Sequence, residues 1–237
     1  MPVNRRRFKC ALVSQKKEAE NVVTLKFKVD ENIQFSFIAG QYVIVYLEGR
    51  SGPEGKAYTI SSIPGDNFLA ITVKKIGKFS TALHELKIGA TVTVEGPMGH
   101  FYPDEKSREI VFLAAGIGIT PFLSIIRAYA KENPKDKKIL LFYSNKTKED
   151  TAFFDELNKL SGNNSIELFY YLTRQKVKDK HIKEFNRIDI NSIKRKLKNL
   201  VGRDYFICGP IKFVFDIRRA LLDSGVSELK IRTEAFY

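Results

Sequence analysis

Residues 110–121 read IVFLAAGIGITP, in which an apolar run ends at Gly116 and Gly118 and continues into Thr120 and Pro121. An unbroken apolar run is typical of a strand that is buried on both faces, and the glycines allow a sharp turn and a close backbone approach to a ligand. Threonine is a common N-cap and proline suits the first helical position, so we expect Thr120 to cap a helix that begins at Pro121. Because free amides at a helix start attract phosphate, the stretch predicts a dinucleotide site. A tight strand–helix connection without a ligand is the alternative.

The sequence that follows this stretch alternates predicted strands with predicted helices. We expect strands at 110–114, 138–144, 166–172, 205–208 and 229–234, and helices at 121–131, 150–160, 190–200 and 212–224. Such alternation favours a parallel sheet with helices on its faces. We therefore predict an α/β domain over residues 104–237, built on a doubly wound, five-stranded parallel sheet.

The sequence before residue 104 has a different rhythm, with short runs of β-branched and aromatic residues between glycines and prolines. We expect strands at 8–13, 22–29, 41–47, 58–60, 68–73 and 91–95, and one helix at 80–86. Several short strands at this spacing indicate a closed all-β structure. The first domain is therefore predicted to be an antiparallel β-barrel over residues 1–103.

The composition excludes several classes of protein. No apolar run approaches the roughly 20 residues that span a bilayer, so we expect no membrane span and a cytoplasmic location. Cys10 and Cys208 are the only cysteines, too few for a disulfide framework or for a four-thiolate iron–sulfur cluster in this chain. The three histidines, His84, His100 and His181, lack metal-ligand spacing, and we predict no metal site.

The formal net charge of +13 indicates an affinity for something acidic. Nucleic acid, an anionic membrane, a phosphate-bearing cofactor and an acidic protein all meet that description. No zinc-finger spacing or aromatic RNA-binding signature accompanies the charge, so we expect no nucleic-acid partner. We expect the protein to be a monomer.

In the barrel half, residues 56–62 read KAYTISS and combine a cation, an aromatic ring and hydroxyl groups. A flavin needs such groups, namely a flat ring against the isoalloxazine, a hydroxyl near N5 and positive charge at the pyrophosphate. An ordinary strand with alternating polar residues has the same pattern. The candidate residues here are Lys56, Tyr58, Thr59, Ile60 and Ser62.

A second candidate segment begins at Val73 and Lys74, passes Gly77 and enters a helix with Ser80 or Thr81 as its cap. A capped helix start after a strand is a possible phosphate-binding site. Together with residues 56–62, this gives two anion-binding sites beside an aromatic strand, which suggests a dinucleotide that lies along the barrel. The alternative is a capped helix without a ligand.

In the α/β half, Cys208-Gly209-Pro210 ends a predicted strand at the edge where such sheets bind ligands. We expect Cys208 to lie in the crevice beside the glycine loop, and a buried structural cysteine is the alternative. Glu234, Phe236 and Tyr237 directly follow the last predicted strand, which favours an ordered end over a frayed one.

Together these motifs resemble those of the ferredoxin-NADP reductase superfamily, whose members pair an FAD-binding β-barrel with an NAD(P)-binding α/β domain. The resemblance covers nearly the whole chain. The matched motifs, in chain order, are Lys56-x-Tyr58-Thr59, Gly77-x-x-Ser80-Thr81, Gly116-x-Gly118-x-Thr120-Pro121, Cys208-Gly209-Pro210 and the ending Glu234-x-x-Tyr237.

Two departures from the family's pattern affect the predicted site. Lys56 replaces the family's arginine; lysine keeps the charge but lacks the bidentate fork, so we expect FAD to be held less firmly. The ending is one residue longer than the plant-type ending of the family, so either Phe236 or Tyr237 can be the ring that stacks on the flavin.

The resemblance implies that hydride passes from NADPH or NADH to flavin N5. It gives catalytic roles to Thr59 near N5, Cys208 beside the nicotinamide, Glu234 in proton movement or polarity, and Tyr237. The residues that it implies in cofactor binding are Lys56, Tyr58, Thr59, Ile60, Ser62, Val73, Lys74, Gly77, Ser80, Thr81, Gly116, Gly118, Thr120, Pro121, Lys146, Arg174, Cys208, Gly209, Pro210, Phe236 and Tyr237. Lys146 and Arg174 follow two strand ends where a 2′-phosphate can be held, which favours NADPH.

The implied activity is that of an FAD-dependent NAD(P)H oxidoreductase that passes electrons to a separate, acidic redox protein, with ferredoxin or flavodoxin as the first expectation. An oxygenase, a cytochrome or free flavin is an alternative acceptor. A basic nucleotide-fold binding module without turnover is the alternative from another class.

Overall fold

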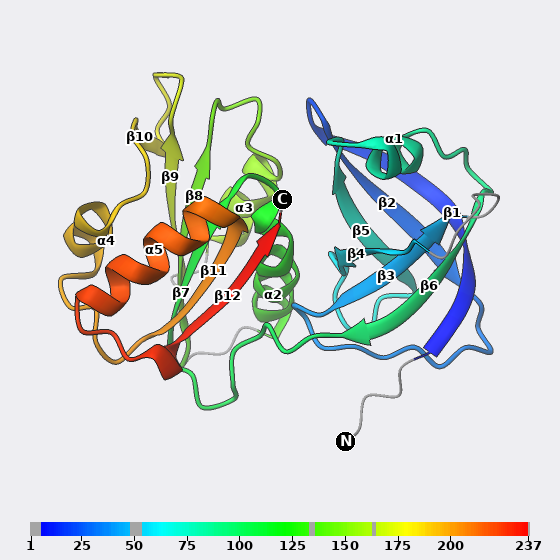
Figure 1. Cartoon of the computed structure of the whole chain (residues 1–237), viewed down its shortest axis with the longest axis horizontal. Coiled ribbons are helices and arrows are strands. Elements are labelled where there is room, and N and C mark those ends of the chain that lie inside the picture. Colours follow the sequence, from blue (N-terminus) through cyan, green and yellow to red (C-terminus); the bar gives the residue numbers. More distant parts are fainter. Residues whose placement is uncertain (1–5, 48–53, 133–135, 163–164, 237) are drawn as a thin grey trace.

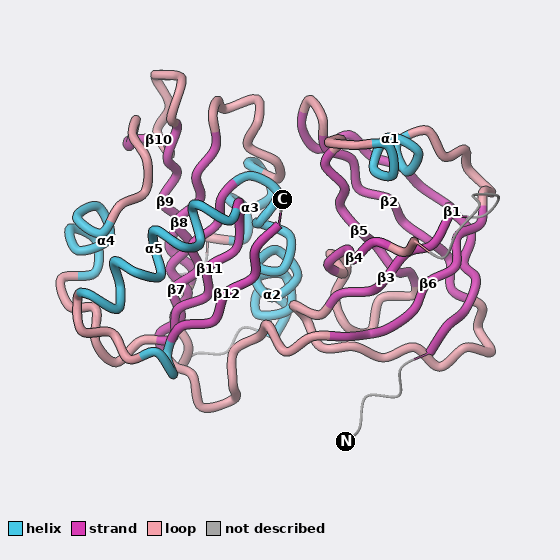
Figure 2. Tube along the Cα trace, viewed as in Figure 1, coloured by secondary structure: helices cyan, strands magenta, loops and turns pink. Residues whose placement is uncertain are grey.

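The computed structural model describes residues 6–47, 54–132, 136–162 and 165–236. The chain forms two β-sheet structures side by side, a barrel half and an α/β half (Figure 1). Figure 2 shows strands in both halves and helices almost entirely in the α/β half.

The barrel half is a six-stranded antiparallel sheet with the strand order β4-β3-β6-β1-β2-β5. Its strands are β1 (Arg6–Ala19), β2 (Val22–Val29), β3 (Tyr42–Leu47), β4 (Lys56–Thr59), β5 (Phe68–Lys74) and β6 (Thr91–Met98), and its helix is α1 (Lys78–His84). An antiparallel bridge between Ile60 and Ile71 joins the end of β4 to β5, the other edge of the sheet. The predicted antiparallel barrel is therefore confirmed.

Alternating side chains of these strands fill the barrel core. Leu12, Leu25, Phe27, Val43 and Val45 are completely buried. Some of their neighbours in sequence, such as Val13 and Lys28, are exposed, because successive side chains of a strand face opposite sides of the sheet, whereas Thr24 beside Leu25 is also buried. Burial of these apolar side chains is the main stabilising contribution to the barrel.

The α/β half is a parallel sheet with the strand order β10-β9-β8-β7-β11-β12. Its strands are β7 (Glu109–Ala115), β8 (Lys138–Asn145), β9 (Ile166–Leu172), β10 (Ile182–Glu184), β11 (Asp204–Pro210) and β12 (Ile231–Phe236). Its helices are α2 (Ile119–Glu132), α3 (Phe154–Leu160), α4 (Ile190–Leu197) and α5 (Ile211–Asp223).

The doubly wound arrangement is confirmed, and the number of strands is corrected. Phe112 of β7 stacks on Phe122 of α2 with ring centroids 4.5 Å apart, whereas Val111 and Leu113 belong to the apolar cluster on the opposite face, together with residues of α4 and α5. The sheet has six strands where the sequence predicts five. The extra strand, β10, is only three residues long and is too short to give a periodic pattern.

The start of α2 also differs from the prediction. Residues 116–118 form a 3-10 turn, and α2 begins at Ile119, so Thr120 lies inside the first helical turn and is not the N-cap. Its hydroxyl donates a hydrogen bond to the carbonyl oxygen of Ile117 at 3.2 Å. The turn forms because Gly116 adopts a left-handed conformation, with φ of 56°.

The two halves share one apolar core. Ala19, Val22, Ala39 and Phe101 of the barrel half are buried in the same cluster as α2 residues such as Phe122. Phe101 lies 5.7 Å from the Phe122 ring and 5.4 Å from the Phe206 ring. Helix α2 lies between the barrel and the parallel sheet (Figure 1). Within the described ranges, no helix is long and apolar enough to cross a membrane.

Candidate functional site

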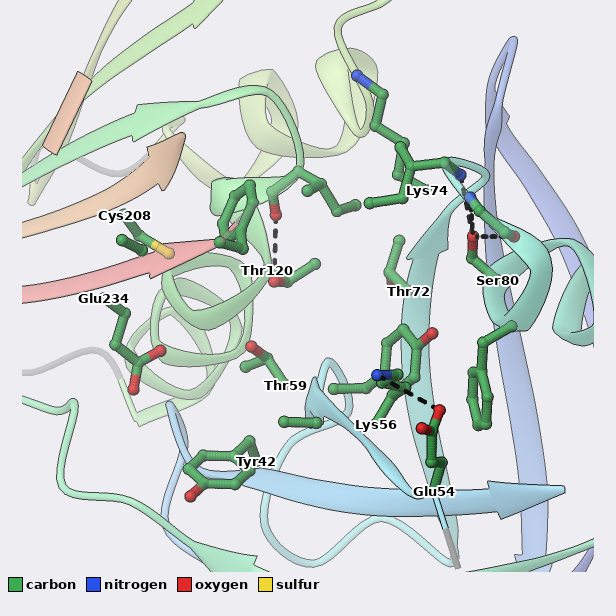
Figure 3. Close-up of a pocket in the computed structure, with 18 of the residues that line it drawn as sticks. Tyr42, Glu54, Lys56, Thr59, Thr72, Lys74, Ser80, Thr120, Cys208 and Glu234 are labelled. Carbon is green, nitrogen blue, oxygen red and sulfur yellow. Dashed lines mark hydrogen bonds and ion pairs between the residues drawn. The ribbon is translucent and has the colours of Figure 1, made fainter. Parts of the chain in front are cut away.

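A cavity of about 950 Å³ lies between the barrel and the carboxyl edge of the parallel sheet. Its volume is at the upper end of the roughly 300–1,000 Å³ that is common for small-molecule sites. In Figure 3, Cys208 and Glu234 lie on one side of this cavity, and Lys56, Thr72 and Lys74 lie on the other. The cavity lies at the ends of β7 and β11, which are neighbours in the sheet. The chain leaves β7 toward β8 on one side and leaves β11 toward β12 on the other. Open α/β sheets bind ligands at such switch points.

Ten of the residues predicted from the sequence line this cavity. They are Lys56, Tyr58, Thr59, Lys74, Gly77, Ser80, Thr120, Cys208, Glu234 and Phe236. Tyr237 lies outside the described residues. The structure thus brings the two halves of the predicted site together at one cavity.

Other predicted residues do not line this cavity. Ile60 and Val73 are fully buried in the barrel core, so their side chains contact protein. The Ser62 hydroxyl accepts a hydrogen bond from the Ala70 amide at 3.0 Å. The remaining members of this group lie in α1, in the glycine turn, at the start of α2 or at the end of β11; they are Thr81, Gly116, Gly118, Pro121, Gly209 and Pro210.

The β4 strand presents the barrel side of the cavity. Tyr58 stacks on Phe79 of α1, with ring centroids 6.2 Å apart and planes 22° apart. Burial raises the pKa of the Tyr58 hydroxyl to about 12, so it is protonated at neutral pH. The exposed Lys56 ammonium lies 4.0 Å from the Glu54 carboxylate, which partly offsets its positive charge at this wall.

The turn before α1 differs from the predicted cap. Gly77 occupies the N-cap position, and Ser80 lies three residues into the helix. The Ser80 hydroxyl oxygen accepts hydrogen bonds from the amides of Ile76 at 2.9 Å and Gly77 at 3.0 Å. These two amides are therefore already satisfied by protein, and the phosphate-binding site here remains a prediction.

The glycine turn packs directly on the end of β11. A methyl group on Gly118 would lie 2.2 Å from the Cys208 carbonyl oxygen and 2.5 Å from its carbon. The sequence predicted that the glycines let the backbone approach a ligand closely. At Gly118, the backbone instead approaches the backbone of Cys208. A methyl group on Gly116 would meet no atom within 4 Å, so the open side of the turn is at this residue.

Cys208 and Glu234 are neighbours on adjacent parallel strands. They are paired in register between β11 and β12. Burial raises the pKa of the Glu234 carboxyl to about 7. Burial, with a smaller contribution from the Glu234 charge, raises the pKa of the Cys208 thiol well above its ordinary range. Near neutral pH, the site therefore holds a neutral thiol beside a carboxyl group that can gain or lose a proton.

Lys146 and Arg174 follow the ends of β8 and β9, at the same edge of the sheet as the cavity. The Arg174 amide donates to the Lys146 carbonyl oxygen at 2.9 Å, and both side chains are exposed. The two residues therefore lie side by side at this edge, although neither lines the cavity described above.

Two family models match this chain. The oxidoreductase FAD-binding domain matches residues 9–102, and the oxidoreductase NAD-binding domain matches residues 112–219. The chain belongs to the ferredoxin-NADP reductase superfamily of flavoprotein oxidoreductases.

Individual relatives agree with this assignment. The flavohemoprotein of Bacillus subtilis is 25% identical over 234 residues, which are 95% of this chain and 58% of that protein. The 2-halobenzoate 1,2-dioxygenase electron transfer component of Burkholderia cepacia is 30% identical over 220 residues, which are 90% of this chain and 63% of that protein. The chain spans less than two thirds of the length of these relatives.

The fold has a close counterpart among solved structures. A ferredoxin NADP+ reductase from Neisseria gonorrhoeae with bound FAD and NADP has a TM-score of 0.84 and 23% sequence identity, over 98% of this chain and 99% of that chain. This similarity confirms the two-part fold of the superfamily member described here.

The cavity fits the two cofactors of this superfamily, FAD and a nicotinamide dinucleotide. On the barrel side, Tyr58 offers an aromatic surface and Thr59 a hydroxyl, while Lys56 and Lys74 offer positive charge for a pyrophosphate. Thr120, Cys208 and Glu234 line the opposite side, and the glycine turn next to them leaves room at Gly116 for a second ligand to approach the backbone. One cavity can therefore hold the reacting ends of both cofactors.

Several lining residues escaped the sequence analysis. Tyr42 lines the cavity and lies opposite Thr59 in the β3–β4 pairing. Thr72, Phe79 and Ile117 also line it. Phe79 and Ile117 lie inside the recognised motifs and could have been found there. Tyr42 and Thr72 depend on strand register, which the sequence pattern alone does not specify.

We expect both cysteines of this flavoprotein to resist alkylation in the folded state at pH 8. Cys10 is 4% and Cys208 2% exposed, and burial disfavours the thiolate that reacts. Mass spectrometry after iodoacetamide treatment should detect little labelling in the native protein and two labels in the urea-unfolded protein. Rapid native labelling of Cys208 would contradict its burial.

Proposed function

We propose that the protein takes hydride from NAD(P)H onto FAD and passes electrons to a separate redox protein, with ferredoxin or flavodoxin as the first candidate. The single observation that carries the proposal is the shared cavity: Thr59 and Tyr58 of the flavin motif line it together with Thr120, Cys208 and Glu234 of the nicotinamide half. When bound, FAD accepts hydride from the reduced nicotinamide and releases the electrons to the next carrier.

The residues of the cavity have complementary roles in this proposal. The Thr59 hydroxyl donates a hydrogen bond near flavin N5, and the Tyr58 ring packs on the isoalloxazine. The neutral Cys208 thiol packs beside the nicotinamide without adding a charge. The Glu234 carboxyl, with its pKa raised to about 7 by burial, holds or releases a proton at its carboxylate oxygens near neutral pH. The chain thus supplies orientation and local polarity.

Of the two aromatic residues at the end of the sequence, Phe236 is the one that the structure describes. Phe236, the last residue of β12, lines the cavity. We propose that it packs against the flavin, and Tyr237 stays the alternative.

We propose NADPH as the preferred nucleotide, with Lys146 and Arg174 holding its 2′-phosphate. We expect Arg174→Ala to raise KM for NADPH by about 10- to 100-fold, since a charge-assisted hydrogen bond contributes about 1.5–3 kcal/mol. KM for NADH should change little. Lys183→Ala, which removes an exposed lysine from β10, is the matched control. Equal losses for both nucleotides in steady-state kinetics would count against a 2′-phosphate site.

The charge of the chain supports an acidic electron acceptor. The net charge is +13, and Lys56, Lys74 and Lys78 all line the open cavity. Complementary charge accelerates the encounter of two proteins and orients them. Ferredoxins and flavodoxins are acidic electron carriers of this kind.

A second candidate is a reductase component for an oxygenase. It is favoured by the names of relatives, which include a glycine betaine monooxygenase reductase subunit from Pseudomonas aeruginosa, 28% identical over 234 residues, and the dioxygenase electron transfer component above. Both candidates share the same first half-reaction and differ only in the acceptor.

We also propose that the first domain comprises residues 1–103 and the second residues 104–237. Strand β6 ends at Met98 and β7 begins at Glu109, so this boundary falls in the connection between the two sheets. We propose further that the protein is a monomer in the cytoplasm, which size-exclusion chromatography and cell fractionation can test.

The decisive experiment is anaerobic stopped-flow reduction of the FAD-loaded protein by NADPH and by NADH, followed by reoxidation with ferredoxin, flavodoxin and oxygenase components. We expect bleaching of the flavin absorbance by at least one nucleotide and fast reoxidation by one acidic carrier. Protein that does not bind FAD would refute the proposal and favour a binding module without turnover.

A further inference from the structure

Two neighbouring turns of helix α2 bind directly to the barrel half. The Ser124 hydroxyl donates a hydrogen bond to the Ser62 carbonyl oxygen at 2.7 Å, and the Arg127 guanidinium donates to the Ser61 carbonyl oxygen at 2.5 Å. Ser124 is fully buried, so its hydrogen bond is shielded from water. One helix face therefore holds two consecutive carbonyl groups of the barrel, and we call Ser124 and Arg127 with these two carbonyls the interdomain joint.

The barrel side of this joint is fixed by hydrogen bonds to β5. The Ser61 amide donates to the Ala70 carbonyl oxygen at 2.8 Å, and the Ala70 amide donates to the Ser62 hydroxyl at 3.0 Å. The Ser61 hydroxyl accepts a hydrogen bond from Thr72 at 3.1 Å. The two acceptor carbonyls are thus held in fixed positions on the barrel.

The helix side of the joint is fixed as well. Arg127 makes two parallel hydrogen bonds to the Glu156 carboxylate of α3, at 2.6 Å and 2.8 Å. The guanidinium also lies 5.5 Å from the Phe153 ring. Because a bidentate pair fixes the plane of the guanidinium, the donor that points to Ser61 has little freedom.

The joint connects the two cofactor-binding segments through hydrogen bonds between α2 and the chain that follows β4. On the barrel side, Ser61 and Ser62 follow Thr59, which lines the cavity, by two and three residues. On the other side, Ser124 and Arg127 follow Thr120, which also lines the cavity, by one and about two helical turns. A shift at the joint therefore moves one wall of the cavity relative to the other.

The apolar contacts between the halves cannot set this position alone. The shared core holds Ala39 and Phe101 against α2, but hydrophobic association has no preferred direction. Hydrogen bonds, in contrast, weaken steeply away from a straight geometry. Resting on the proposed function, we propose that Ser124 and Arg127 are positioning residues that set the nicotinamide-binding segment against the flavin-binding strand for hydride transfer.

The test uses Arg127→Lys and Ser124→Ala, with Arg218→Lys of α5 as a matched control, because Arg218 is also paired with a carboxylate, that of Glu228, away from the joint. Lysine at position 127 keeps the charge but loses the fork. Each FAD-loaded variant is compared with the wild type by FAD titration, by nucleotide binding, by the limiting rate of flavin reduction and by hydrogen exchange of segment 59–63 without nucleotide.

We expect both joint variants to bind FAD and nucleotide as the wild type does, while the limiting reduction rate falls by about 10- to 100-fold, since a displacement of about 1 Å can cost 100-fold in rate. Exchange of segment 59–63 should become faster, and the control should match the wild type. An unchanged rate, or a rate that falls only in parallel with FAD affinity, would overturn the positioning role. If neither nucleotide reduces the wild-type protein, the proposed function is refuted. Hydrogen exchange of segment 59–63 would still show whether Ser124 and Arg127 hold the barrel in position.

Discussion

Gly118→Ala is expected to slow reduction of the bound flavin by NADPH or NADH by about 100-fold or more while FAD stays bound. The new methyl group would lie 2.2 Å from the Cys208 carbonyl oxygen and 2.9 Å from the Gly209 amide nitrogen. Both contacts are backbone atoms of a buried strand, so no side-chain rotation relieves the clash, and the glycine turn must move away from β11. A displacement of about 1 Å in a reacting complex can cost 100-fold in rate. Stopped-flow reduction and FAD titration measure the two properties separately.

Gly225→Ala is the control for this substitution. Gly225 has φ of 86°, and a methyl group there would meet no atom within 4 Å, so alanine adds backbone strain without a clash. We expect that variant to lose stability by about 1–2 kcal/mol and to keep its reduction rate. An unchanged rate in Gly118→Ala would show that the close packing of the glycine turn against β11 is not needed for hydride transfer.

Glu234→Gln is expected to increase the stability of the protein at pH 8 and to remove an inflection near pH 7 from the pH profile of flavin reduction. Burial raises the pKa of Glu234 to about 7 in the folded state, whereas an unfolded glutamate titrates near pH 4.3. Between these values the folded state holds a proton that the unfolded state lacks. The stability from this group is therefore complete below the unfolded pKa and is lost as pH rises through about 7.

Glutamine stays neutral at every pH, so the variant avoids the loss of stability that ionisation of the buried carboxyl causes. The gain in the free energy of unfolding should grow from pH 5 to pH 8 and reach at most about 4 kcal/mol, which follows from the size of the pKa shift. Thermal unfolding at both pH values, with FAD at saturation, measures it. The exposed Glu105→Gln is the control and should show no such trend. A loss of stability at pH 8 in Glu234→Gln would mean that the carboxylate has a stabilising partner.

The sequence predicts most of this architecture because each signal is local. The apolar run before Gly116 and the alternation of strands and helices after it are sufficient for a doubly wound parallel sheet. Lys56, Tyr58 and Thr59 could be assigned to a cofactor because they lie within four residues of one another. Cys208 and Glu234 could be placed at one edge because both lie at the ends of predicted parallel strands.

The remaining features depend on contacts between distant segments. Tyr42 enters the cavity through its register with Thr59, and register is not encoded in the alternation of one strand. The true partner of Gly118 is the Cys208 backbone, and no local pattern shows that approach. In the sequence, nothing distinguishes Arg127 from the other polar residues of its helix. Its hydrogen bond to Ser61 forms only because the barrel packs against α2.

The apolar core that both halves share has a consequence for synthesis of the chain. The barrel half precedes α2 in the sequence, so Ala19, Val22 and Phe101 can reach their final environment only after the helix that covers them has been made. Until then the nascent barrel exposes this apolar surface, which is the kind of surface that chaperones bind and that leads to aggregation. Glu234 and Phe236 complete the cavity later still, because β12 is the last described strand. A ribosome-bound chain can therefore form the flavin strand early but gains the whole cavity only after β12 has been synthesised.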